Sequence, residues 1–267
     1  MPELPEVETI RRQLEPVVQG RRVLEADSHP SAKFVPAREV VGARFGSVDR
    51  RGKYLLAAVE PDRELVIHLG MTGTLASVER PSLDDEYVRA RWWLDDGRVL
   101  EMRDIRRFGR LRVVPAGDHS TIPTLRDLGP EPSDPDFDGE RLWRALRASR
   151  RRVKTQLLSQ RPVAGLGNIY ADEALWLARI HPGSRRVTRR QATELRDAVR
   201  MVIGQALDHG GTTLRDYRSV DGRQGDNQGR LACYGRAGLP CLRCGTTLVA
   251  RTYEARTTTW CPTCQRR

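Results

Sequence analysis

Apolar residues recur at helical spacing at the start of the chain. The positions fall three or four residues apart: Val7, Ile10, Leu14 and Val17. Because a helical turn takes about 3.6 residues, this spacing places them on one face. The pattern predicts an amphipathic helix over residues 5–19, which Gly20 ends.

The pattern then changes to short apolar runs between residues 23 and 115. LLAAV, LVIHL, RWWL and RLRVV are examples, and turn signals such as Arg51-Gly52 and Asp95-Asp96-Gly97 separate them. Short apolar runs between turn signals are typical of β-strands. We expect an antiparallel sandwich or barrel, which the first helix joins in a domain over residues 1–120.

The second half of the chain is predicted to be helical. Residues 121–137 have the Pro- and Asp-rich composition of an interdomain linker, and helical spacing follows over 138–149, 152–160, 168–180 and 189–208. Thr188 and Gln191 have the spacing of a capping box before the last helix. We therefore predict an α+β protein with a helical domain over 138–230, which includes a Gly-rich loop at 211–230, and a cysteine-bearing region over 231–267.

The charge balance points to a polyanionic partner. Lys and Arg number 46 against 35 Asp and Glu, and the net charge is +11. Nucleic acid is the expected partner, although ribosomal and regulatory proteins share this balance. Lysines are rare, since only Lys33, Lys53 and Lys154 occur, so each is a candidate for a role that arginine cannot fill. Without an apolar run of membrane length or a secretory signal, we expect a soluble intracellular protein.

Four of the five cysteines form two pairs, Cys241-x2-Cys244 and Cys261-x2-Cys264. This spacing is typical of one tetrahedral Zn²⁺ site. Two disulfides would use the same residues, but they are unusual in an intracellular protein. Four thiolates leave no open coordination position, so we predict one structural Zn²⁺ that holds the hairpin LVARTYEARTTTW. Cys233 is left over and is expected to be a buried thiol.

Two further segments carry candidate chemistry. GLGNIYADE, from Gly165 to Glu173, places glycines and Asn168 at a helix start, where free N–H groups favour a phosphate, although a tight turn needs glycine too. At the N-terminus, Pro2 brings an amine close to Glu3 and Glu6. A terminal prolyl amine can form an iminium with an aldehyde carbon, and the carboxylates can transfer protons. These residues also suit a plain helix start.

MPELPEVE, HLGMTG, RRFG, GLGNIYADE and the four-cysteine region occur in this order over nearly the whole chain. Together they resemble the formamidopyrimidine-DNA glycosylase and endonuclease VIII family, and MPELPEVE resembles the formamidopyrimidine branch, which is bacterial. The resemblance implies a β-sandwich, a helix-two-turn-helix domain with a zinc finger, and a monomeric, cytoplasmic, nucleoid-associated enzyme. It also implies excision of 8-oxoguanine and formamidopyrimidines from double-stranded DNA, followed by β,δ-elimination at the abasic site.

The resemblance also implies roles for individual residues. Pro2 is the nucleophile and Glu3 the catalytic carboxylate, and Lys53 and Arg256 complete the catalytic set by reaching the lesion strand and a phosphate. Glu6 and Lys154 support them. The remaining contacts to DNA fall on a wedge that fills the gap left by the everted base and on two phosphate contacts: Met71, Arg106 and Phe108 in the wedge, and His68 and Asn168 at phosphates.

The chain departs from the family pattern in two places. Asp226-Asn227 replaces an aromatic residue common in the loop over the everted base, and Ile105 stands where proline often precedes RRFG. These changes leave open an oxidised-pyrimidine substrate of the endonuclease VIII type. A lesion-binding protein without catalysis is the second alternative, and an N-terminal-proline tautomerase is excluded by length, charge and cysteines.

Overall fold

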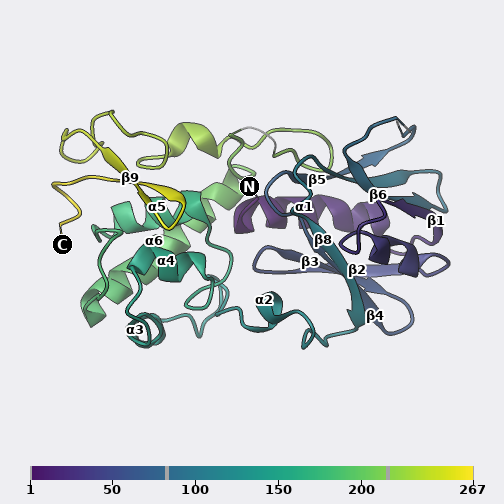
Figure 1. Cartoon of the computed structure of the whole chain (residues 1–267), viewed down its shortest axis with the longest axis horizontal. Helices are drawn as coiled ribbons and strands as arrows, with labels where there is room; N and C mark the ends of the chain where they lie inside the picture. Colours follow the sequence, from purple (N-terminus) through teal and green to yellow (C-terminus); the bar gives the residue numbers. More distant parts are fainter. Residues whose placement is uncertain (1, 82–83, 215–216, 267) are drawn as a thin grey trace. The chain divides into compact units, whose positions relative to one another are not determined.

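The computed structural model describes residues 2–81, 84–214 and 217–266 and divides into two compact units (Figure 1). The first contains Met1–Arg126 and His209–Gln228, and the second contains Asp127–Asp208 and Gly229–Arg267. The division at Arg126 lies inside the expected linker, residues 121–137. The segment His209–Gln228 packs with the first unit, although the sequence pattern predicted it as part of the helical domain.

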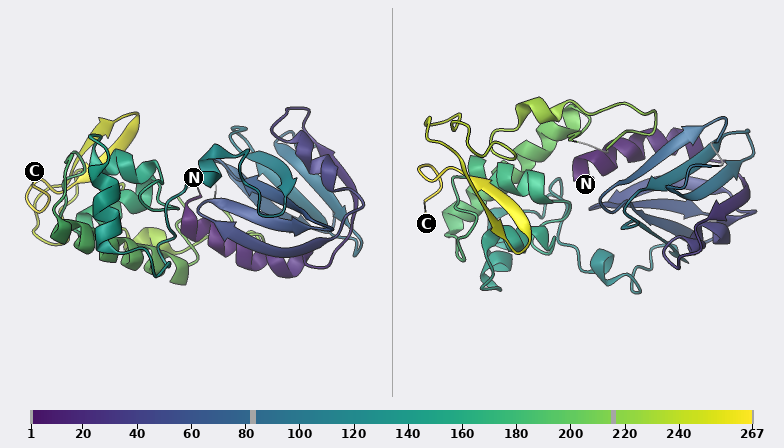
Figure 2. Two further views of the ribbon diagram at one scale, coloured as in Figure 1. Left: turned by 90° about the horizontal axis from the view of Figure 1, so that it is seen from below. Right: turned by 45° about the horizontal axis from the view of Figure 1, so that its top comes forward.

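Two four-stranded antiparallel sheets build the first unit (Figure 2). One has the order β1-β6-β7-β5 and the other β2-β3-β4-β8. Their strands are β1 (Val23–Ser28), β2 (Phe45–Arg51), β3 (Tyr54–Val59), β4 (Arg63–His68), β5 (Gly73–Val78), β6 (Val88–Leu94), β7 (Val99–Asp104) and β8 (Arg110–Pro115). All these pairings are antiparallel, as the turn signals predicted.

Helix α1 (Leu4–Val18) runs alongside the strands in both views of Figure 2. Its apolar face is buried at Val7, Ile10 and Leu14, which belong to one core cluster with residues of both sheets. Burial of each such side chain contributes about 2 kcal/mol. A short 3₁₀ helix, η1 (Val35–Val40), also packs here, because its Ala37 carbonyl accepts from the indole of buried Trp92 at 3.0 Å.

The segment His209–Gln228 completes this unit, and contacts with α1 hold it in place. Tyr217 and Val220 enter the same core cluster, and the backbone N–H of Val220 donates to the side chain of Gln13 at 2.9 Å. Burial, reinforced by the charge of Glu6, raises the pKa of Tyr217. The loop is thus anchored by apolar burial as well as by hydrogen bonds.

Helices form most of the second unit. They are α3 (Gly139–Arg147), α4 (Val153–Leu158), α5 (Asn168–Leu177) and α6 (Arg189–Asp208), each inside a predicted helical range. The short α2 (Pro123–Arg126), in the first unit, and the 3₁₀ turn η2 (Asn227–Arg230) were not predicted. The predicted capping box starts α6, since the N–H of Gln191 donates to Thr188 Oγ1 at 3.1 Å and the N–H of Thr188 donates back at 2.9 Å.

Near the end of the chain lies a two-stranded antiparallel hairpin, β9 (Val249–Tyr253) and β10 (Arg256–Trp260). Glu254 and Ala255 form its turn with positive φ angles of 48° and 62°. In the parts of the chain that the structure describes, no helix is long and apolar enough to cross a membrane.

Candidate functional site

The N-terminus is buried where α1 begins. Pro2 is buried, and Glu3, the N-cap residue, is only 1% exposed. The carboxylate of Glu6 accepts from the backbone N–H of Glu3 at 2.7 Å through one oxygen, and from the N–H of Thr212 at 2.7 Å through the other. Gly211 approaches so closely that a Cβ there would lie 2.8 Å from Glu6. Glu6 therefore fixes both the first residues and the 209–228 segment.

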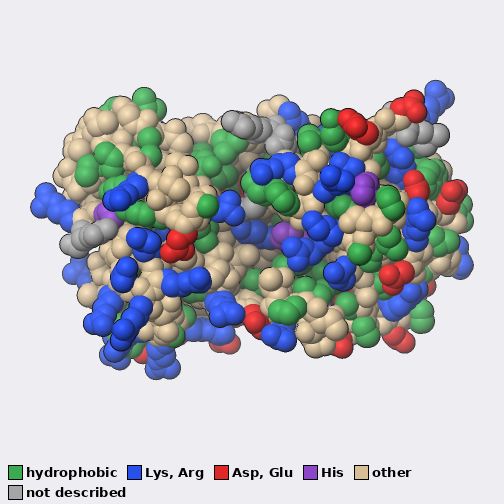
Figure 3. Space-filling model, in the orientation of Figure 1, with side chains coloured by type: hydrophobic (Ala, Val, Ile, Leu, Met, Phe, Trp, Pro, Cys, Tyr) green, Lys and Arg blue, Asp and Glu red, His purple; other side chains and the backbone are tan. Residues whose placement is uncertain are grey.

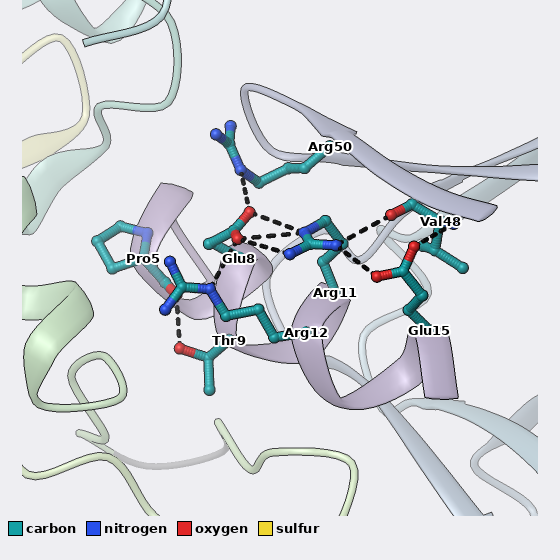
Figure 4. A network of polar contacts seen from close by, with 8 residues as sticks. All are labelled: Pro5, Glu8, Thr9, Arg11, Arg12, Glu15, Val48 and Arg50. Atoms are coloured by element: carbon teal, nitrogen blue, oxygen red, sulfur yellow. Dashed lines mark hydrogen bonds and ion pairs between the residues drawn. The ribbon is translucent and has the colours of Figure 1, made fainter. Parts of the chain in front are cut away.

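A cluster of charged residues joins α1 to Arg50 of β2 (Figure 4). Glu8 accepts from Arg12 at 2.9 Å and from Arg50 at 3.0 Å. Burial acts to raise the pKa of Glu8, but these arginines outweigh it and lower the pKa below its usual value. Arg50 also donates to the carbonyl of Gly52 at 3.0 Å, next to buried Lys53. Glu8 and Arg50 thus position the Lys53 turn relative to α1.

His68 ends β4, and its ring lies against Tyr54 with centroids 4.7 Å apart. Burial, followed by the charges of Arg110 and Lys53, lowers the pKa of His68 from 6.5 to about 4. The ring is therefore neutral near pH 7. The N–H of Gly70 donates to Nδ1 at 3.2 Å, so the proton of the neutral ring lies on Nε2. Nε2–H is a suitable donor to a phosphate oxygen.

The three predicted wedge residues come from two loops that touch. Arg106 and Phe108 are exposed in the loop after β7, with the guanidinium 4.8 Å from the phenyl centroid. Met71 is partly exposed in the loop after β4. Gly70 has a φ of +67°, and a Cβ there would lie 2.5 Å from the carbonyl carbon of Phe108. Close backbone packing thus brings the two loops together.

Asp104, which was not among the predicted site residues, holds these loops in place. It is fully buried and accepts from Thr72 Oγ1 at 2.5 Å and from the N–H of Gly109 at 2.7 Å. Thr72 Oγ1 in turn accepts from the N–H of Arg106 at 3.1 Å. The only sequence signal for Asp104 is its position two residues before the RRFG motif.

In the second unit, Asn168 and Arg256 meet at the finger hairpin. Asn168 is the first residue of α5, and its side-chain amide donates to the carbonyl of Thr257 at 3.0 Å. Arg256, the neighbour of Thr257, is exposed at the start of β10. The start of the predicted phosphate-binding helix therefore lies beside the predicted phosphate-binding arginine.

Lys154 of α4 lies in a buried ion pair rather than on the surface. Its Nζ is 2.6 Å from Asp172 of α5, and the two side chains are 2% and 0% exposed. Nζ also donates to Thr258 Oγ1 at 3.0 Å, and the other carboxylate oxygen of Asp172 accepts from the N–H of Thr259 at 3.0 Å. Burial is the main reason why the pKa of Asp172 rises to about 6. The pair fastens β10 to the helices.

Glu173 makes a second attachment to the finger. Its carboxylate accepts from the N–H groups of Ala232, Cys233 and Tyr234 at 2.9, 2.8 and 2.7 Å. Cys233 is fully buried, as predicted, and burial raises the pKa of its thiol. Neither carboxylate of the Asp172-Glu173 pair was singled out from the sequence, where both look like ordinary helix residues.

The four paired cysteines form a metal-binding cluster. The sulfur atoms of Cys241, Cys244, Cys261 and Cys264 all lie within 4.8 Å of one another. Tetrahedral zinc with Zn–S bonds of about 2.3 Å needs sulfurs roughly 3.8 Å apart, and the Sγ atoms of Cys244 and Cys261 are 3.5 Å apart. The indole of Trp176 in α5 donates to Cys241 Sγ at 3.4 Å. The cluster fits one structural Zn²⁺, and it is braced by the helices.

Three family models match the chain in order along its length. Residues 1–111 match the formamidopyrimidine-DNA glycosylase N-terminal domain, residues 128–218 match the formamidopyrimidine-DNA glycosylase H2TH domain, and residues 238–267 match a zinc finger found in FPG and IleRS. The third match supports zinc as the metal of the cysteine cluster.

Curated relatives cover nearly the whole chain. The formamidopyrimidine-DNA glycosylase of Thermus thermophilus is 46% identical over 269 residues, which are 99% of this chain and 98% of that protein. The protein of the same name from Deinococcus radiodurans is 42% identical over 99% of this chain and 97% of its own length. The chain belongs to the formamidopyrimidine-DNA glycosylase family.

Solved structures of this family confirm the α+β fold predicted from the sequence. The MutM (FPG) protein of Thermus thermophilus matches with a TM-score of 0.92 at 46% identity, over 99% of this chain and 98% of its own. A mutant Lactococcus lactis FPG in complex with DNA containing Fapy-dG matches over the whole of both chains, with a TM-score of 0.92 at 32% identity. The Lactococcus lactis Fpg bound to abasic-site DNA has a TM-score of 0.91.

Proposed function

We propose that this protein is a bifunctional DNA glycosylase and abasic-site lyase of base excision repair, which removes 8-oxoguanine and formamidopyrimidines from double-stranded DNA. One observation carries the proposal: the buried Pro2-Glu3 start of α1 belongs to the unit in which Glu8 and Arg50 position the Lys53 turn. Family relatives that bind Fapy-dG and abasic DNA support the substrate. The enzyme acts as a monomer in the bacterial cytoplasm, on the nucleoid.

Chemistry begins once the initiator methionine is removed and the Pro2 amine is free. The amine attacks C1′ of the damaged nucleotide, the N-glycosidic bond breaks, and its electron pair leaves with the base, which takes a proton. The attached nitrogen loses its proton, and its lone pair then forms a cationic iminium with C1′ as the C1′–O4′ bond of the sugar ring breaks. Glu3 is placed to protonate the sugar oxygen and so open the ring, because a buried carboxylate next to the nucleophile is a suitable general acid.

The iminium makes strand cleavage possible, because it accepts the electrons released at C2′. Loss of a C2′ proton moves an electron pair toward the iminium and expels the 3′-phosphate in β-elimination. A second elimination expels the 5′-phosphate. Water then hydrolyses the imine, which releases the unsaturated sugar fragment and regenerates the Pro2 amine.

The remaining site residues position DNA for this chemistry. Neutral His68 offers Nε2–H, and Lys53 offers an ammonium, to the phosphates of the damaged strand. To reach a stacked base the enzyme must evert it, at a cost of a few kcal/mol, and Met71, Arg106 and Phe108 fill the space left behind. Arg256 and Asn168 bind phosphates, and Lys154 supports them by holding β10 through Asp172.

Zinc has a structural role in this account. Four thiolates complete a tetrahedral Zn²⁺ site, so the ion stabilises the fold and offers no open position to substrate. Cys241, Cys244, Cys261 and Cys264 hold it, and the hairpin between the two pairs presents Arg256.

A second candidate function is the excision of oxidised pyrimidines. The observation that favours it is Asp226-Asn227 in place of the aromatic residue common in the loop. The side chain of buried Asn227 donates to Thr212 Oγ1 at 2.9 Å, and its N–H donates to the carbonyl of Gly211 at 3.1 Å. Asn227 therefore connects the end of the loop to its beginning at Gly211 and Thr212. These contacts hold the two ends of the loop together without an aromatic residue at positions 226–227.

Single-turnover cleavage of three duplexes tests the proposal. One carries 8-oxoguanine opposite cytosine, one carries an oxidised pyrimidine, and one is undamaged. We expect the purine lesion to be cut at least tenfold faster than the pyrimidine lesion, leaving a one-nucleotide gap with phosphate at both ends. Faster cutting of the pyrimidine lesion would assign the second candidate, and no cutting of any lesion duplex would leave only DNA binding.

A further inference from the structure

The second unit contains a basic hollow away from the finger hairpin. It has a volume of about 940 Å³ and is lined by the end of α3, residues 149–150, residues 185–188 and the first turn of α6. It includes neither Asn168 nor Arg256, the predicted phosphate contacts of this unit. Figure 3 shows Lys and Arg side chains gathered over the α3 side.

Four exposed arginines supply the charge of the hollow: Arg147, Arg150, Arg185 and Arg186. No acidic residue lies among the described residues that line the hollow. Within the described ranges, these four guanidiniums make no ion pair. Arginines nearby behave differently, since Arg144 and Arg189 pair with Glu140, and Arg190 pairs with Glu194. Guanidiniums that share one concavity without counterions repel each other and attract an anion.

The hollow is also ordered. The guanidinium of Arg147 lies 4.7 Å from the ring centroid of Trp143, and that of Arg189 lies 4.4 Å from it. These contacts fix the direction of two cations, and a base that stacks on this indole would have to compete with them. The 20-residue helix α6 begins at the rim, and its dipole adds positive potential there.

We propose that this hollow binds the sugar-phosphate backbone of a second nucleic-acid segment, separate from the duplex that carries the lesion. Planar guanidiniums bind phosphate oxygens in pairs, and recognition through the backbone needs no base stacking. An acidic peptide fits less well, because the apolar residues of the lining offer little open anchor: Val187 is 7% exposed, and two guanidiniums lie against the Trp143 ring. Contact with a second segment lets the enzyme transfer between DNA segments during its search.

Binding of a second segment goes beyond the proposed function. The experiment relies on the proposed function only to attach the protein covalently to a lesion duplex. Full-length protein is first trapped by borohydride on a short lesion duplex, which occupies the catalytic surface. Binding of a labelled, undamaged 20-base-pair duplex to this complex is then measured by anisotropy over a salt series. The test variant carries R147A, R150A, R185A and R186A. The control carries R22A, R38A, R63A and R112A, four arginines of the first unit that donate to backbone carbonyls.

We expect the loaded wild type and the control to bind the second duplex. The test variant should bind it at least tenfold more weakly, with a salt slope smaller by about 3.6 if all four arginines contact phosphates, because each lost phosphate contact removes about 0.9 from the slope. Single-turnover excision should be unchanged. Equal binding by variant and wild type, equal losses in variant and control, or binding of polyglutamate but not of DNA would each overturn the proposal.

Failure of the proposed function would be visible separately. If trapping yields no adduct, the same salt series is run on the unloaded proteins, where a slope unchanged in the test variant would contradict the second site. If the variant instead loses affinity for a longer lesion duplex and the loaded wild type binds no second duplex, the hollow only extends the catalytic surface, and the proposal is wrong.

Discussion

Glu6 and Thr212 are 206 positions apart in the sequence, yet the backbone N–H of Thr212 donates to the Glu6 carboxylate at 2.7 Å. The other oxygen of the same carboxylate accepts from the N–H of Glu3. One buried side chain therefore joins the start of α1 to the segment His209–Gln228. In the proposed enzyme, this links the nucleophile to the loop expected to close over the everted base.

Glu6→Gln should weaken this link, because the new amide nitrogen meets a backbone N–H that needs an acceptor. Loss of one hydrogen bond to a buried charge should lower the free energy of unfolding by about 2 kcal/mol. We expect excision of 8-oxoguanine to slow far more than cleavage at a preformed abasic site, since only the first step needs a base in the loop. Single-turnover rates on both duplexes measure this.

Glu25→Gln is the matched control, because Glu25 is exposed on β1. It should leave both rates and the unfolding free energy unchanged. Equal slowing of excision and abasic cleavage in Glu6→Gln would contradict a role of Glu6 through the loop.

His68 should make stability depend on pH. Its pKa is about 4 in the folded protein against 6.5 for the free side chain, so between these values the unfolded chain binds the extra proton. Stability from this group is present above pH 6.5 and is lost as the pH falls toward 4. Urea unfolding at pH 7.5 and pH 5 should show a smaller pH-dependent loss for His68→Gln than for wild type. An identical loss in both would place the cause in other groups.

Loss of one partner of the buried Lys154–Asp172 ion pair should strongly lower the free energy of unfolding of the second unit. Asp172→Asn leaves the ammonium without its counterion, and breaking a buried pair costs about 3–5 kcal/mol. We expect this loss in urea unfolding of the second unit, with weaker DNA binding as β10 loosens. The double variant Lys154→Met, Asp172→Leu should recover much of the stability, and a double variant as unstable as the single one would argue against the electrostatic explanation.

Zinc removal should affect the second unit and leave the folding of the first unit unchanged. Cys244→Ser should reduce bound zinc from one equivalent to none and abolish DNA binding, because the hairpin with Arg256 loses its anchor. The first unit should keep its own unfolding transition. Cys233→Ala, outside the cluster, should keep its zinc. Normal binding of lesion DNA by a zinc-free sample would show that the finger is not needed.

The sequence predicted what depends on local pattern. Helix α6 begins at the Thr188 capping box, and the strands follow the turn signals, because both depend on neighbours in the chain. The cysteine spacing likewise predicted the cluster, since each pair lies within one short turn. Neighbours along the chain thus specify most of the elements.

Contacts between distant segments could not be predicted in this way. Asp104 has a role only because the loops after β4 and β7 meet, and Asp172 only because β10 packs on α5. The helical spacing of the second half gave no sign that His209–Gln228 packs with the first unit, because Glu6 and the core recruit it. Likewise, the resemblance gave Lys154 a supporting role, but only its contact with Asp172 of another helix shows that this lysine is buried.

The most direct test of the central claim is borohydride trapping. The wild type, Pro2→Gly and the control Pro5→Ala are incubated with a duplex carrying 8-oxoguanine opposite cytosine, and the covalent protein–DNA adduct is quantified. We predict an adduct for the wild type and for Pro5→Ala, and its loss or strong reduction for Pro2→Gly. Equal trapping by Pro2→Gly, or no adduct for the wild type even on abasic DNA, would contradict the account.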